Sequence, residues 1–136
     1  MTGRTLALTC LAAGAIALGS ACGGNDTAPS PPSTTTTTIS GGGPPTITIT
    51  SGVVSPKALT VPRGTQVTFT NNDSVPHEMN SNPHPSHTDC PEINRVSFLS
   101  PGQSKTTDPL NTARTCGYHD HARNTDTNLQ GTITIQ

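Results

Sequence analysis

The chain has 136 residues, of which 13 are glycine, 13 are proline and only 11% are charged. This composition excludes a large enzyme, a coiled coil and a charge-rich disordered tail, and it leaves room for one small domain. The formal net charge is -1, and the seven lysines and arginines are scattered along the chain. We therefore expect no nucleic-acid partner, because nucleic-acid binding needs a concentrated basic surface.

The first 21 residues predict export. Arg4 precedes an apolar run from Leu6 to Leu18, which has the length of a signal-peptide core and is too short to span a bilayer as a helix. The run leads through small residues to Cys22, a pattern that resembles the lipobox of bacterial lipoproteins, and this resemblance implies lipidation of Cys22. Ordinary secretory cleavage nearby is the alternative. Either way we expect a periplasmic or cell-surface protein, and only the lipidated form would touch a membrane, through its anchor at Cys22.

Residues 22–45 predict a disordered tether. They are dominated by threonine, proline, glycine and serine, and they include five consecutive threonines from Thr34 to Thr38. Such a segment cannot bury enough apolar surface to offset the entropy lost on ordering. Its expected role is to give the folded part of the chain reach from an anchor.

Residues 46–136 predict an all-β domain. Apolar side chains alternate with polar ones in four places, which is the period of half-buried strands. Proline, glycine and asparagine interrupt every longer stretch, so no helix is expected. Short strands at this spacing favour an antiparallel two-sheet sandwich. The alternating pairs are Ile47 with Ile49, Val67 with Phe69, Val96 with Phe98, and Ile133 with Ile135.

The chemistry-bearing residues lie in two short stretches of this domain. Residues 77–90 hold His77, Met79, His84, His87 and Cys90, and residues 116–121 hold Cys116, His119 and His121. Imidazole, thiolate and thioether are ligands that suit copper, and zinc competes for nitrogen and sulfur sites. The two stretches therefore predict a metal site, with copper as the first candidate and zinc as the second.

The order of motifs resembles the cupredoxins, the family of plastocyanin and azurin. The resemblance covers residues 46–136, and it implies a Greek-key β-sandwich with a copper ion at one end. The motifs that carry it are Ile47-Thr48-Ile49, Ser55-Pro56-Lys57-Ala58-Leu59-Thr60-Val61-Pro62-Arg63-Gly64, Val67-Thr68-Phe69-Thr70-Asn71-Asn72-Asp73, Cys116-Gly117-Tyr118-His119 and Gly131-Thr132-Ile133-Thr134-Ile135.

By position, the resemblance implies that His77, Cys116 and His119 are the copper ligands. A thiolate with two imidazoles accommodates both copper oxidation states, so this set implies an electron carrier with a redox protein as partner. The family usually places a methionine two residues before the glycine that opens the last strand, and here that residue is Leu129. Met79 is the candidate substitute, because in an extended segment it points to the same side as His77.

Three histidines are additional to this set. His121 follows the second implied ligand, and His84 and His87 lie in an insertion after the first. We predict that His77, His119 and His121 lie within metal-binding reach of one another, with the other two histidines near the same end of the sandwich.

A second arrangement competes with the thiolate site. In an exported protein two domain cysteines are expected to pair, so Cys90 and Cys116 predict a disulfide that encloses 25 intervening residues. That bond would remove the thiolate. The remaining histidine cluster would bind Cu(II) or Zn(II) and would suit metal holding or delivery rather than electron transfer.

An enzyme is not expected. The chain has no serine in a nucleophile-elbow context and no phosphate-binding glycine loop, and Glu78 and Glu92 are its only glutamates. Copper redox chemistry at a histidine cluster is the one enzymatic alternative that the sequence leaves open.

Overall fold

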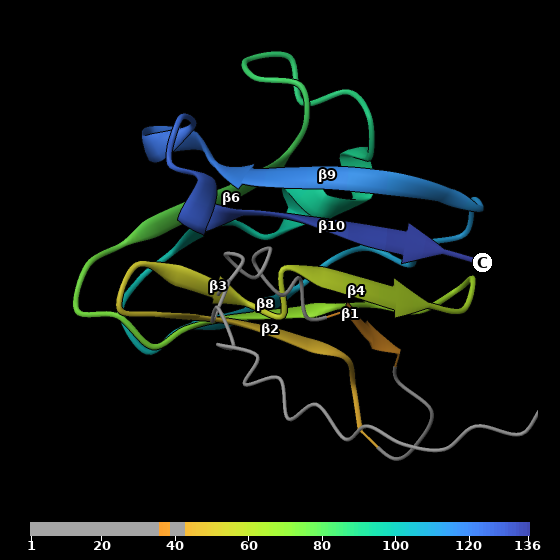
Figure 1. Ribbon diagram of the computed structural model, residues 1–136, viewed down its shortest axis with the longest axis horizontal. Coiled ribbons are helices and arrows are strands. Elements are labelled where there is room, and N and C mark those ends of the chain that lie inside the picture. The colour runs from red at the N-terminus through yellow and green to blue at the C-terminus, as the bar shows by residue number, and fades with distance from the viewer. Residues whose placement is uncertain (1–35, 39–42) are drawn as a thin grey trace, which may run out of the picture. The chain divides into compact units, whose positions relative to one another are not determined.

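A computed structural model describes residues 36–38 and 43–136, and these form two facing β-sheets (Figure 1). The strand order is β1-β4-β10-β9-β6-β7 in the larger sheet and β3-β2-β5-β8 in the smaller. The larger sheet comprises β1 (Thr36–Thr38), β4 (Ala58–Val61), β6 (His77–Ser81), β7 (Ser97–Leu99), β9 (Arg114–Asp120) and β10 (Gln130–Ile135). The smaller comprises β2 (Thr46–Thr50), β3 (Val53–Ser55), β5 (Thr68–Asn71) and β8 (Ser104–Thr106).

Alternating side chains build the core between the sheets. Ile47 and Ile49 of β2 are fully buried, while the threonines beside them are not. Phe69 of the smaller sheet meets Tyr118 of the larger sheet edge to face, with 5.2 Å between the ring centres. An aromatic pair of this kind joins the two layers. The all-β sandwich expected from the alternation is thereby confirmed.

The sheets are mixed, whereas the sequence predicted antiparallel sheets. β4 pairs with β10 in parallel, and so does β2 with β5, while β9 runs antiparallel to both β6 and β10. Only strands joined by a tight turn must run antiparallel. Between β2 and β5 the chain passes through β4 in the other sheet, which lets it return to the first sheet in the original direction.

One strand falls within the expected tether. β1 pairs in parallel with β4, and its three residues belong to the segment 22–45 that the sequence predicts as a tether. The edge of β4 offers unpaired backbone groups, and threonine favours extended backbone, so a strand can add there. The predicted signal peptide and Cys22 lie outside the described residues.

The described residues contain no α-helix, in agreement with the sequence. They contain three short 3-10 helices, η1 (Pro91–Arg95), η2 (His121–Arg123) and η3 (Thr127–Leu129). Within this part of the chain, no helix has the length and apolar character needed to cross a membrane.

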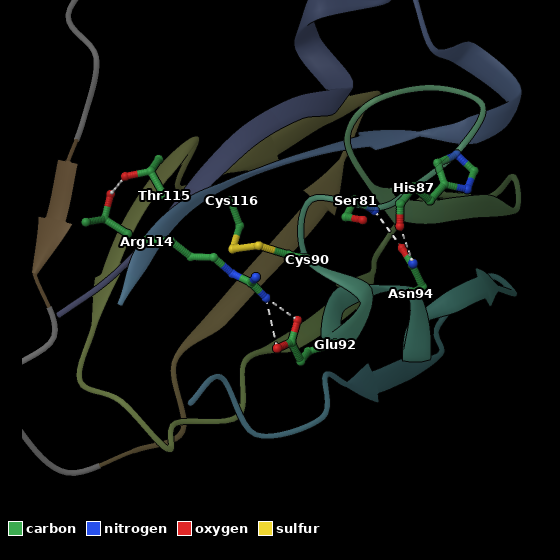
Figure 2. The surroundings of a disulfide bond; sticks show 9 residues. Ser81, His87, Cys90, Glu92, Asn94, Arg114, Thr115 and Cys116 are labelled. Carbon is green, nitrogen blue, oxygen red and sulfur yellow. Dashed lines mark hydrogen bonds and ion pairs between the residues drawn. A yellow bond between two sulfur atoms is a disulfide. The ribbon is translucent and has the colours of Figure 1, made fainter. Parts of the chain in front are cut away.

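A disulfide bond joins Cys90 to Cys116 (Figure 2). Both residues are fully buried, and their Cα atoms are 5.8 Å apart. Beside them, the Arg114 guanidinium donates to both carboxylate oxygens of Glu92, at 2.9 and 2.6 Å, which ties η1 to β9. The loop between β6 and η1 is therefore fixed at both ends, by the β6 ladder and by a covalent bond to β9.

Removing this disulfide should destabilise the domain. For the Cys90→Ala/Cys116→Ala variant we expect the free energy of unfolding to fall by about 3 kcal/mol, because the bond restricts a loop of 25 residues in the unfolded chain. Denaturant titration of the parent and the variant measures the difference. Equal stability of the two proteins would contradict a structural role for the bond.

Candidate metal centre

The loop after β6 carries two of the histidines and lies above β9 in the view of Figure 1, and polar contacts fix its shape. The Asn94 side chain accepts from the Ser81 backbone N–H and donates to the His87 carbonyl, both at 2.8 Å (Figure 2). The backbone N–H of Asp89 also donates to the Asn82 carbonyl at 2.8 Å. These bonds give the loop a defined shape although it contains no regular strand or helix.

Strand alternation separates the side chains of β9 into two sets. Cys116 and Tyr118 point into the core, and Asp120 follows them on the same face. His119 points to the opposite face, where the loop after β6 lies. Gly117, also on that face, leaves room for Asn82, because a Cβ at this glycine would collide with the Asn82 side chain.

Four histidines converge where this loop crosses the end of β9. His84, His87, His119 and His121 each offer a ring nitrogen, and these four nitrogens all lie within 4.8 Å of one another. Between His121 Nδ1 and His87 Nε2 the distance is 3.1 Å. The nearest ring centres, those of His84 and His121, are 4.7 Å apart. We call these four residues the histidine cluster.

One ring nitrogen of His119 is free to bind a metal ion, and the other is held by a hydrogen bond. Its Nδ1–H donates to the Asn82 side-chain oxygen at 2.7 Å. This fixes the tautomer that leaves the lone pair on Nε2. Nε2 is buried and has no hydrogen-bond partner among the residues that the structure describes. Buried polar atoms normally have a partner, so an unpaired imidazole nitrogen within a group of histidines is suited to bind a metal ion.

Two members of the cluster have lowered pKa values. Burial lowers the pKa of His119 most, the neighbouring His87, His84 and His121 lower it further, and Asp120 opposes the shift. Burial is also the largest cause of the lowered pKa of His87, followed by the charges of His121 and His84. Both imidazoles are therefore neutral at neutral pH, which is the form that binds a metal ion.

His77 does not belong to the histidine cluster. Its Nδ1 lies 2.7 Å from a carboxylate oxygen of Asp120, and its Nε2 lies 3.0 Å from one of Asp73. The sequence placed His77 with His119 and His121, but the structure brings the latter two together with His84 and His87 instead. The separation follows from β9, because Asp120 and its two histidine neighbours face opposite ways.

The two sulfur atoms expected at the site lie elsewhere. Cys116 Sγ is bonded to Cys90, and Met79 is fully buried in the hydrophobic core. Asn82, which orients His119, was not recognised in the sequence. A carboxamide in the loop that carries two histidines is the signal that could have identified it.

Solved structures of other proteins share this architecture. No protein-family model matches the chain, and no curated protein matches it in sequence. Its structure matches a purple cupredoxin from Nitrosopumilus maritimus with 25% identity and a TM-score of 0.50, over 68% of this chain and 99% of the other. The chain has a cupredoxin fold.

Two further cupredoxin structures support this assignment. A variant of amicyanin with Cu(I) matches at 16% identity and a TM-score of 0.54, over 67% of this chain and 80% of the other. A fern plastocyanin variant matches at 21% identity and a TM-score of 0.52, over 67% of this chain and 99% of the other. The described domain, which carries the histidine cluster, therefore has the fold of a cupredoxin sandwich.

Acid should weaken the hydrogen bonding around Asp73. Burial opposes ionisation of this carboxyl group, but hydrogen bonds from Gly52, His77 and Ser51 outweigh it, and the net effect is a lowered pKa. A lowered folded-state pKa contributes stability that is present above the unfolded value of about 4 and is lost as the pH falls through the folded value.

We therefore expect Asp73→Asn to lower the free energy of unfolding at pH 7 by about 1 to 3 kcal/mol, as for loss of an acceptor serving partly buried donors. Thermal unfolding between pH 7 and pH 2 measures the gap between parent and variant. The gap should narrow below about pH 4. A gap that stays constant across this range would contradict the role of the carboxylate charge.

Proposed function

We propose that this chain is an exported copper-binding protein of the cupredoxin fold and that it holds or delivers the metal through the histidine cluster. The single observation that carries the proposal is the convergence of four imidazole nitrogens within 4.8 Å of one another. Export, and an anchor at Cys22, are proposed from the signal-like N-terminus, since those residues lie outside the described part of the chain.

The donor set suits Cu(II). Imidazole binds both copper and zinc, and at a nitrogen site Cu(II) binds more tightly than Zn(II). The buried Nε2 of His119 and the lowered pKa values of His119 and His87 provide ligands that need not lose a proton at neutral pH. Copper is also the metal of the matched amicyanin variant, which is a Cu(I) protein. Zinc is the competing occupant.

Holding or delivery fits the cluster better than electron transfer does. The electron carrier implied by the resemblance needs the Cys116 thiolate, and in the structure that sulfur is bonded to Cys90. An imidazole-only site lacks the strong copper–thiolate bond of blue-copper carriers. The partner that follows from this is a copper donor or acceptor, whereas a redox protein would be the partner of the thiolate arrangement.

Copper titration of the metal-free protein tests the cluster. We expect one Cu(II) per chain in the parent, and a loss of affinity of about 100-fold or more in His87→Ala and in His119→Ala, since each loses a ligand. Asn82→Ala should lose about 10- to 100-fold, the usual effect of removing a group that orients a ligand. A competition titration against a chelator of known affinity measures each value.

His77→Asn is the matched control. It removes the fifth histidine of the domain but leaves all four members of the cluster, so the Cu(II) affinity should stay within a few-fold of the parent value. Loss of binding in this variant, with binding retained in His87→Ala, would contradict the proposed site and would restore His77 as a ligand.

A further inference from the structure

A network of ion pairs occupies the end of the sandwich next to the histidine cluster. His77 Nδ1 lies 2.7 Å from Asp120 Oδ2, and Arg123 Nη1 lies 3.2 Å from both of these atoms. On the other side of the ring, Asp73 lies 3.0 Å from His77 Nε2. Asp120 is fully buried, and its second oxygen accepts the Ala122 N–H at 3.0 Å.

The spacing of this network matches the ligand spacing expected from the cupredoxin resemblance. The resemblance implies a thiolate three residues before the second histidine, with both facing His77. In the structure the two side chains that face His77 Nδ1 are Asp120 and Arg123, which are also three residues apart. The ligand positions therefore fall four residues later in the sequence than Cys116 and His119.

Leu129 supports this shift in register. The resemblance assigns it the place of the family's methionine, and it lines one open cavity of about 290 Å³ together with His77, Arg123 and Asp73. Cys116, by contrast, lies four residues before Asp120 on β9 and is bonded to Cys90. The position of the family's methionine is therefore next to His77 and Arg123, and Asp120 contacts both of these residues.

The residues present there do not fit the family's copper ion. A carboxylate replaces the soft thiolate, and a guanidinium, which is always protonated and has no lone pair to donate, replaces the second imidazole. Its positive charge also repels a metal cation at short range. Both nitrogens of His77 already face carboxylates.

We propose that Asp120 and Arg123 stand at the thiolate and second-histidine positions of the cupredoxin site and that their ion pair, in contact with His77, closes this position to metal. The inference does not depend on metal binding by the histidine cluster, which lies on the other face of β9. It assigns the chain a cupredoxin site whose ligand positions are filled by an ion-paired network.

Restoring the two ligands tests the proposal. In Asp120→Cys/Arg123→His, the Sγ atom takes the place of the carboxylate carbon, so the space of the two oxygens becomes available beside His77. We expect one free thiol in the domain and, on addition of Cu(II), an intense blue or green colour from thiolate-to-copper charge transfer. The parent should have no free domain thiol and give only a pale complex.

The matched control is the same double variant with His77→Ala, which keeps the new thiol and the new imidazole. It should lose the intense colour. A folded double variant without the colour would overturn the proposal, and so would colour that persists without His77, because the thiolate would then be binding copper through other residues.

Arg123→His alone provides a second test if the double variant does not fold, since the Arg123 side chain is 41% exposed and its replacement is tolerable. His77, Asp120 and the new imidazole then form a two-nitrogen, one-carboxylate set. Zinc bound after equilibrium dialysis should rise by one ion per chain relative to the parent, whatever the parent binds. An unchanged zinc content would overturn the proposal.

Discussion

The bond between Cys90 and Cys116 is the constraint on which the site depends. It joins the insertion after β6 to the core face of β9, and both cysteines are fully buried. Because the loop is held at this point, His84 and His87 lie beside His119 and His121 at the end of β9. The same bond uses both domain thiols, which removes the thiolate that a blue-copper site needs. It therefore favours a histidine-only metal site over a copper–thiolate site.

β9 divides the neighbouring chemistry into two faces. On one face Asp120 pairs with His77 and Arg123, and on the other His119 joins the histidine cluster. Adjacent residues in a strand point to opposite sides, so one step along the backbone separates a closed ion-paired network from the histidine cluster. Cupredoxin architecture thus supports a candidate metal centre outside the position that the resemblance implies.

The sequence predicted the sandwich well because alternating residues such as Ile47, Ile49 and Phe69 report burial directly. It also identified all four members of the histidine cluster as metal-ligand candidates. Strand direction was predicted less well, because side-chain alternation is the same in parallel and antiparallel sheets. The pairing of β2 with β5 depends on where the chain crosses between sheets, which is not encoded in local alternation.

The assignment of His77 to the metal site shows a different limit. Motif spacing aligned Cys116 and His119 with the family's ligands, yet the same three-residue spacing recurs at Asp120 and Arg123. Only the register of β6 against β9, in which Met79 pairs with Asp120, shows which pair faces His77. Spacing within one segment cannot reveal its register against a distant strand.

Pulsed electron paramagnetic resonance of the Cu(II)-loaded parent protein, combined with its visible spectrum, tests the central claim most directly. The account predicts a pale complex in which several imidazole nitrogens couple to the copper and no thiolate charge-transfer band is present. An intense thiolate band, together with one reactive domain thiol in the metal-free protein, would contradict it.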